Sequence, residues 1–172
     1  MTKSTVIRLF FLIALVIPGL AGAAAKVSPL SPSDARQLDY QRTSIRDLSA
    51  LHLGRRLGSG KERDLATLQA LLDQNVVKSG ETRELQSMGV VLGDLIAQQL
   101  DMDWVVYEDQ YGRSRALQLG PSENFLFPIT MISRRIDNGI PVNIIDIYNK
   151  AIAEMEPYIA TRYRRNYRKL PE

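Results

Sequence analysis

The sequence predicts one α+β domain, in which N-terminal helices pack on a small antiparallel sheet of about three strands and two C-terminal helices complete the fold. Three observations carry this prediction. Apolar residues recur at helical spacing over the first hundred residues, they alternate after Asp103, and helical spacing returns after Pro128. The expected organisation is a signal peptide over 1–23, a linker over 24–33, the domain over 34–157 and a basic tail over 158–172.

The first segment is typical of a secretory signal peptide. Lys3 and Arg8 precede the apolar run LFFLIALVI, and small residues lie at 21–23. Cleavage is predicted after Ala23, with Ala25 as the alternative. The run is short compared with the roughly 20 apolar residues of a membrane-spanning helix, so no span is expected after processing.

Composition favours an exported bacterial protein. The chain has no cysteine, which excludes a lipid-anchored lipoprotein, disulfides, thiol chemistry and a thiolate metal site. Export without disulfides favours the periplasm, and no cofactor is expected. Residues 26–157 carry 15 Lys and Arg against 18 Asp and Glu, so the body is mildly acidic and the tail is basic.

Three helices are expected in the N-terminal half. Ser33 is expected to cap the first, which ends at Gly54. Ser59 and Glu62 have the spacing of a capping box for the second. The third covers 81–100, and its apolar face consists of Leu85, Met88, Leu92, Ile96 and Leu100.

Two glycines, Gly89 and Gly93, lie on or beside that face of the third helix. Each costs about 1 kcal/mol relative to alanine inside a helix. Their presence predicts that another backbone packs closely against this helix.

The stretch DWVVYEDQYGRSRALQL predicts a hairpin. Trp104 and Val106 face one side and Val105 and Tyr107 the other, so both faces of the first strand are expected to be covered. The turn is DQYG, and SRALQL returns as the second strand. A short third strand, FLFP, ends at Pro128.

The C-terminal part predicts two helices. Pro128 opens the first, and Asn138-Gly139 stops it in a left-handed conformation. Asn143 caps the second. Pro157 removes a backbone donor and is expected to kink or restart that helix.

The order of these elements resembles a bacterial family known as domain of unknown function 3806. The resemblance covers roughly Met88 to Met155 and includes the paired glycines, Trp104 in its strand, and the hairpin turn. It extends to Phe127-Pro128 and to the basic pair Arg134 and Arg135. The resemblance supports the α+β fold, and it implies no activity, because the family has none assigned.

Arg134 and Arg135 are candidate binding residues. Arg135 lies beside Ile132 and Ile136 and is expected at the edge of the core, closer than Arg134. A partly buried arginine usually has a carboxylate partner, for which Asp94 and Glu108 are the candidates. The alternatives are a structural ion pair and an anion site.

The basic tail is a second candidate. Ile159, Tyr163 and Tyr167 recur four residues apart, which is the pattern of an amphipathic basic helix that binds an anionic surface or packs on the body. The predicted export argues against nucleic acid as the native binding partner. The candidate binding residues of the tail are Arg162, Arg164, Arg165, Arg168 and Lys169.

No catalytic or metal motif is recognised, so the leading hypothesis is a non-enzymatic protein that binds another macromolecule. The segment GSGK lacks the remaining residues of a phosphate loop, and the single histidine, His52, cannot form a typical zinc site alone. The alternative is a cell-envelope hydrolase that uses Asp103, Glu108 or Asp109. An envelope protein or an anionic surface is the expected partner.

Overall fold

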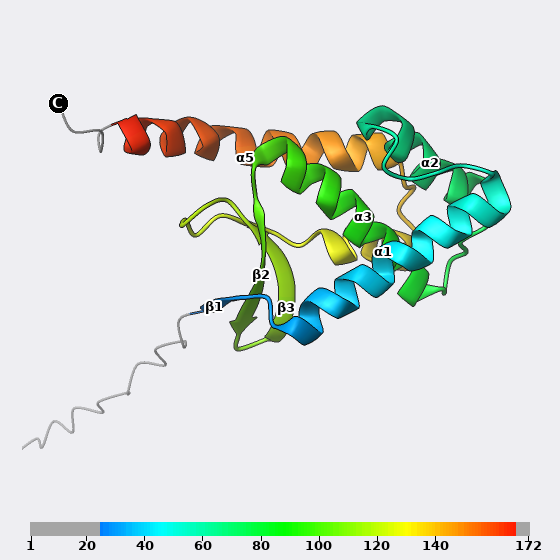
Figure 1. The fold of residues 1–172 in the computed structure, drawn as a ribbon, viewed down its shortest axis with the longest axis horizontal. Helices are drawn as coiled ribbons and strands as arrows, with labels where there is room; N and C mark the ends of the chain where they lie inside the picture. The colour runs from blue at the N-terminus through cyan, green and yellow to red at the C-terminus, as the bar shows by residue number, and fades with distance from the viewer. Residues whose placement is uncertain (1–24, 168–172) are drawn as a thin grey trace, which may run out of the picture.

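The computed structural model describes residues 25–167, with the side chains of residues 25–159, and has the predicted α+β architecture (Figure 1). The predicted signal peptide, its predicted cleavage after Ala23 and residues 168–172 lie outside the described residues. The elements follow one another as β1 (Lys26–Pro29), α1 (Pro32–Leu53), α2 (Lys61–Asp73), α3 (Thr82–Leu100), β2 (Asp103–Asp109), β3 (Gly112–Gln118), β4 (Phe125–Leu126), the 3-10 helix η1 (Pro128–Thr130), α4 (Ser133–Asp137) and α5 (Ile144–Tyr167).

The sheet has four antiparallel strands in the order β1-β2-β3-β4. The residues expected to form only a linker supply β1, so the linker prediction is corrected over Lys26–Pro29. Lys26 lies opposite Glu108 and Pro29 opposite Val105. Strand β1 pairs with the backbone groups along one side of β2, which would otherwise lack protein partners. The other side of β2 pairs with β3.

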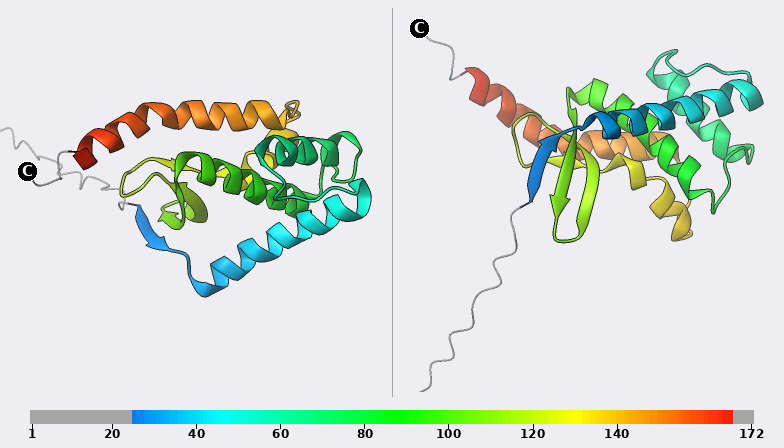
Figure 2. Two further views of the ribbon diagram at one scale, coloured as in Figure 1. Left: turned by 45° about the horizontal axis from the view of Figure 1, so that its top comes forward. Right: turned by 60° about the horizontal axis from the view of Figure 1, so that its bottom comes forward.

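Helix α3 is the centre of the helical layer. It contacts α1, α5 and η1, and it lies between α1 and α5 in Figure 1. Its predicted apolar face is fully buried in the core. Figure 2 shows that the sheet lies toward one end of the helices and that the β2–β3 hairpin extends from there.

Both glycines of α3 mark close contacts, but the predicted backbone contact is found only at Gly89, whereas Gly93 meets side chains. A Cβ atom on Gly89 would lie 2.5 Å from the carbonyl oxygen of Ile129 and 2.6 Å from that of Pro128. A Cβ atom on Gly93 would lie 2.6 Å from the Trp104 ring. The backbone of η1 and the indole of β2 therefore pack directly on α3, and this contact fixes where the chain runs after β4.

Helix capping differs from the prediction at two places. Ser31, not Ser33, caps α1, because Asp34 completes a capping box with Ser31 while Pro32 occupies the first turn. Ser59 does not cap α2, which starts after Gly60. The Asp64 carboxylate instead accepts the backbone N–H groups of Gly58 and Ser59, at 3.0 and 3.2 Å.

The C-terminal helices are partly as predicted. Pro128 opens only a 3-10 turn, and α4 is short, but Gly139 has a φ of 66° as its left-handed stop. Asn143 accepts the N–H of Asp146 at 3.0 Å, which confirms the cap of α5. Helix α5 continues through Pro157 without an interruption, so the predicted restart is wrong. Among the described helices, none combines the length and apolarity that crossing a membrane requires.

Candidate functional site

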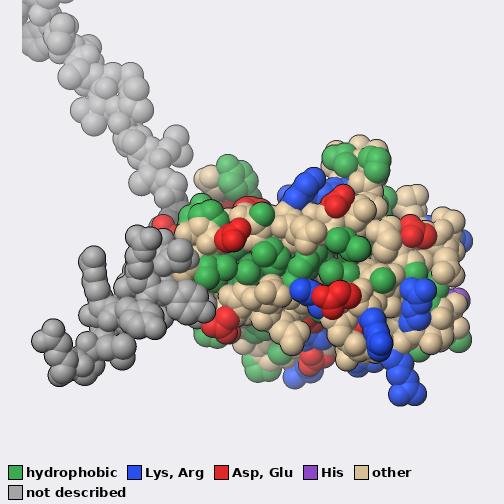
Figure 3. All heavy atoms as spheres, turned by 90° about the horizontal axis from the view of Figure 1, so that it is seen from above, with side chains coloured by type: hydrophobic (Ala, Val, Ile, Leu, Met, Phe, Trp, Pro, Cys, Tyr) green, Lys and Arg blue, Asp and Glu red, His purple; other side chains and the backbone are tan. Residues whose placement is uncertain are grey.

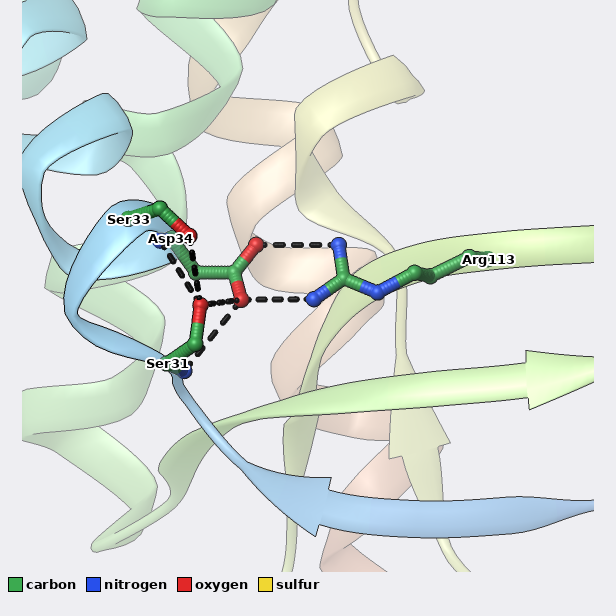
Figure 4. A network of polar contacts seen from close by, with 4 residues as sticks. All are labelled: Ser31, Ser33, Asp34 and Arg113. Atoms are coloured by element: carbon green, nitrogen blue, oxygen red, sulfur yellow. Dashed lines mark hydrogen bonds and ion pairs between the residues drawn. The ribbon is translucent and has the colours of Figure 1, made fainter.

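The tip of the hairpin is tied to the start of α1 by an ion pair with two contacts. Arg113 on β3 donates from Nη1 and Nη2 to the two carboxylate oxygens of Asp34, at 3.0 and 2.6 Å (Figure 4). Ser31 donates to the same carboxylate from its backbone N–H and its hydroxyl group. One carboxylate therefore caps α1 and anchors β3.

The two side chains of this ion pair differ in how far they are buried. The Asp34 side chain is 6% exposed, whereas that of Arg113 is 48% exposed. The hydrogen bonds from Arg113 and then those from Ser31 hold the pKa of Asp34 well below its usual range, against the effect of burial. The same contact raises the pKa of Arg113. Arg113 is accordingly a structural residue that positions the hairpin.

A second two-contact ion pair joins α1, α3 and β2. Arg42 donates from Nε and Nη2 to Asp94, at 2.7 and 2.8 Å, and its Nη1 reaches Asp39 at 2.7 Å. The indole N–H of Trp104 donates to Asp94 at 2.9 Å. Asp94 is thus committed to Arg42, and the expectation that it pairs with Arg135 is wrong.

A hollow runs along the outer side of β3, and we call it the hairpin groove. One wall is β3 from Gly112 to Arg115, and the other consists of Phe127, Ile129, Thr130 and Arg134. Its volume is about 470 Å³. It is partly open to solvent, so it suits a chain segment better than a small molecule that must be enclosed.

Aromatic rings form part of the hairpin groove. The ring of Tyr107 meets Phe127 edge to face, with a centroid distance of 5.3 Å and an interplanar angle of 86°. It meets Phe125 in the same way at 5.0 Å. Tyr111, at the hairpin turn, is 88% exposed although it lines the groove. These rings offer apolar contact area to a bound partner.

Two arginines bring unpaired positive charge to the hairpin groove. Among the described residues, Arg115 and Arg134 have no ion pair or side-chain hydrogen bond with any partner. Asp109 is the one carboxylate of the groove, and it accepts the N–H of Tyr111 at 2.8 Å. The groove therefore has the chemistry to bind a carboxylate or another anionic group.

Arg135 lies in a neighbouring hollow. Its Nη1 donates to the carbonyl oxygen of Met131 at 2.6 Å, and it is more buried than Arg134, as predicted. This hollow has a volume of about 250 Å³ and includes Glu154. Arg134 lines both hollows, whereas Arg135 lines only the second. The structure thus places Arg134 in the candidate site and Arg135 beside it.

Another cationic hollow, of about 360 Å³, lies between α2 and the loop that joins α1 to α2. Its arginines are Arg55, Arg56 and Arg63, and it contains no aromatic side chain. Arg55 reaches the carbonyl oxygen of Ala66 at 3.4 Å. This hollow provides a charge-matched comparison for the hairpin groove.

The acidic residues of the alternative hydrolase hypothesis do not converge. Asp103 lies opposite Gln118 at the start of β2, while Asp109 lies opposite Gly112 at its other end, roughly 20 Å away at the rise of a strand. Glu108 faces Arg113 across the hairpin. Across the described part of the chain, no three metal-ligating side chains of His, Cys, Asp or Glu gather.

The basic residues of the tail remain a prediction. Helix α5 includes Arg162, Arg164 and Arg165 in its backbone, but their side chains, and the whole of Arg168 and Lys169, lie outside the described residues.

Seen from the side of α5, acidic and basic side chains are interspersed on the surface of the domain, and hydrophobic side chains form a band between them (Figure 3).

The sequence interpretation missed Arg115, Tyr111 and Phe127 as site residues. A signal for them was present, because the seven-residue β3 pairs with a strand that Pro128 cuts short. Because β4 is much shorter than β3, part of β3 has no neighbouring strand, and the hollow lies beside that part.

Comparison with known proteins is consistent with this fold. Residues 64–148, from α2 into α5, match a sequence family described as "Domain of unknown function (DUF3806)", which confirms the resemblance for that part of the chain. A crystal structure from Bacteroides thetaiotaomicron VPI-5482, determined at 1.50 Å resolution, is similar with a TM-score of 0.69 and 18% identity. The similarity covers 76% of this chain and 48% of that one, so this chain spans about half of its length and shares its fold. No curated protein matches the chain in sequence.

Proposed function

We propose that this protein is exported to the bacterial periplasm and acts there by binding another macromolecule at the hairpin groove. The observation that carries the proposal is the pair of unpaired arginines, Arg115 and Arg134, in an open groove with exposed aromatic side chains. Unpaired guanidinium groups and exposed aromatic rings are enriched where proteins bind one another.

The ion pairs of the fold support this assignment. Arg42 and Arg113 each bind a carboxylate at two points and serve the architecture. Arg115 and Arg134 have no such role. Two arginines that line the same groove and form no ion pair within the described residues are available to bind an anionic partner.

Export is supported by the sequence alone. The leader has the charge, length and small residues of a cleaved signal peptide, and the absence of cysteine is compatible with any redox compartment. The periplasm then supplies partners from the cell envelope.

Removal of two arginine charges from the hairpin groove or from the other cationic hollow tests which surface binds the partner. The protein is immobilised and exposed to a detergent extract of the cell envelope, and bound species are quantified by mass spectrometry. The double variant Arg115→Gln/Arg134→Gln is compared with Arg55→Gln/Arg63→Gln, which removes the same charge from the other cationic hollow.

We expect a discrete species to bind the native protein and the Arg55/Arg63 variant, and to be lost from the Arg115/Arg134 variant. Equal capture by all three proteins, or loss from the Arg55/Arg63 variant alone, would contradict the assignment to the hairpin groove.

A further inference from the structure

We propose that the hairpin groove takes an extended, acidic peptide segment of a partner protein, which adds to the sheet as a strand beside β3. The inference rests on the proposed function and specifies how the partner is bound. It follows from the hydrogen-bonding pattern of β3, from the course of the chain after β4, and from the charge of the groove.

Part of the outer side of β3 has no neighbouring strand. Strand β4 pairs only with Leu117 and Gln118, so β3 from Gly112 to Ala116 is paired with β2 alone. The N–H of Leu119 donates to Asn124 at 3.1 Å, which shows that the backbone groups of Leu119 point outward. Backbone direction alternates along a strand, so the N–H and C=O groups of Arg113 and Arg115 point outward too.

These outward groups have no protein partner within the described residues. Outside the ladder with β2, no hydrogen bond joins the backbone of Arg113 or Arg115 to another described residue. They point into the hairpin groove, which Gly112 to Arg115 line. An unpaired edge of this kind is a template for another strand.

Pro128 explains why the chain itself does not cover this edge. Continuing the register from Leu117 and Leu126 places Pro128 opposite Arg115. Proline has no N–H to donate to the ladder. Its carbonyl oxygen accepts the N–H of Met131 at 3.0 Å, and its backbone packs on Gly89. The chain therefore leaves the ladder after Leu126, and η1 lies beside β3 as part of the far wall of the groove.

The dimensions suit a short extended segment. The open part of β3, from Gly112 to Ala116, is five residues, or about 14–17 Å at the rise of a strand. An added strand lies about 4.8 Å from its neighbour and directs alternate side chains to opposite faces. One set would then reach toward Phe127 and Tyr111.

The charge of the groove selects an acidic segment. Arg115 and Arg134 are unpaired, and Asp109 is the single opposing carboxylate. A glutamate or aspartate in the bound strand can form charge-assisted hydrogen bonds with these guanidinium groups. Lysine or arginine at the same place would be repelled.

A second copy of this chain is a poorer occupant. Pairing β3 with β3 of another copy would bring Arg113 and Arg115 of both chains into one ladder. Like charges directly opposite each other destabilise a sheet, and charged residues on edge strands prevent self-association. The arginines thus disfavour a homodimer through this edge.

The test uses the full mature chain and capped heptapeptides of alternating valine and glutamate as the probe. Binding is followed by the NMR shifts and hydrogen exchange of the Arg113 and Arg115 backbone amides. A valine–lysine peptide controls for charge. Two N-methylated valine–glutamate peptides, methylated at odd or at even positions, control for the backbone hydrogen bonds.

We expect the valine–glutamate peptide to shift and protect both amides, and the valine–lysine peptide to leave them unchanged. One N-methylated peptide should bind and the other should fail, because only alternate N–H groups face β3. Binding by both N-methylated peptides, equal binding of the lysine peptide, or no shift of either amide at millimolar peptide would overturn the inference.

Two variants at position 115 separate the effect of the side-chain charge on peptide binding from the effect of the backbone N–H. Arg115→Gln keeps the outward N–H and removes the charge, and we expect affinity to fall by about tenfold, as for one lost charge-assisted contact. Arg115→Pro also removes the N–H, which β2 does not use, and should abolish binding while the thermal unfolding curve stays cooperative. Equal affinity of the two variants would contradict strand addition.

The experiments distinguish failure of the strand-addition proposal from failure of the proposed function. If envelope capture depends on Arg115 and Arg134 but no peptide shifts the β3 amides, the groove binds its partner in another way. If capture does not depend on these arginines, the proposed function itself is wrong.

Discussion

Arg113 on β3 and Asp34 in the first turn of α1 form a two-point ion pair across 79 positions of sequence. The contact fixes the hairpin against the helical layer and so sets the position of one wall of the hairpin groove (Figure 4). The side chain of Arg113 thus positions the groove, while its backbone lies at the edge of β3 that we propose for partner binding.

Removal of this ion pair should destabilise the protein in a pH-dependent way. We expect Arg113→Gln to lower the free energy of unfolding by about 1–2 kcal/mol near neutral pH, because Asp34 stays buried and charged with only the Ser31 donors. The loss of stability is modest because the Arg113 side chain is half exposed, so solvent screens the ion pair. Urea unfolding over a range of pH measures it.

The sign of the pH effect follows from the lowered pKa of Asp34. A carboxyl group with a lowered pKa contributes stability above its unfolded pKa, 3.8, and loses it as the pH falls toward the folded value. The stability difference between native protein and Arg113→Gln should therefore shrink below pH 3.8. A difference that stays constant from neutral to acidic pH would show that this ion pair is not its source.

Gly89→Ala should destabilise the protein even though alanine is the better helix former. The new methyl group would collide with the carbonyl oxygens of Pro128 and Ile129. We expect a net loss of about 1–3 kcal/mol, as for an overpacked core. Gln98→Ala, on an exposed position of the same helix, is the control and should leave thermal stability nearly unchanged. A melting temperature raised by Gly89→Ala would contradict the close packing of η1 on α3.

The sequence predicted those features that depend on local pattern. Alternation identified β2, Gly89 and Gly93 indicated close packing, and Asn143 and Gly139 marked helix ends. Each of these signals involves residues close together in the chain.

The site depends on pairings between distant residues, which a single sequence does not reveal. The partner of Arg113 is 79 positions away, and Asp94 is 52 positions from Arg42. The segment of β1 is too short and too proline-rich to be recognised as a strand, and it becomes one because β2 offers it a partner. Arg134 was found from sequence, but Arg115 acquires significance only when the edge of β3 is seen to be open.

Trp104 is the single tryptophan of the chain and reports on the Asp94 ion pair. Asp94→Ala removes the acceptor of both the indole and Arg42, so we expect a loss of about 1–3 kcal/mol and a shift of the fluorescence emission maximum. Asp39→Ala, which removes an exposed partner of the same arginine, should cost less than about 1 kcal/mol and leave the emission unchanged. Identical emission spectra for the two variants would argue against the Trp104–Asp94 hydrogen bond in solution.

The proposed export makes a prediction about the N-terminus of the mature chain. Intact mass measurement of protein from the periplasmic fraction should show a first residue of 24, after cleavage at Ala23, or of 26, after cleavage at Ala25. Alteration of the small residues at 21–23 should leave the precursor uncut. Full-length protein recovered from the cytoplasm alone would contradict the proposed location.

Crosslinking in living cells tests the central claim, which is that the hairpin groove is the surface through which this protein acts. A photo-crosslinking amino acid replaces Tyr111 at the groove or, as the control, Tyr40, which is 60% exposed on α1. We expect one discrete adduct with an envelope protein at position 111, its loss on addition of Arg115→Gln/Arg134→Gln, and no adduct at position 40. An adduct at position 40 but not at 111, or an adduct at 111 that persists without the two arginines, would contradict it.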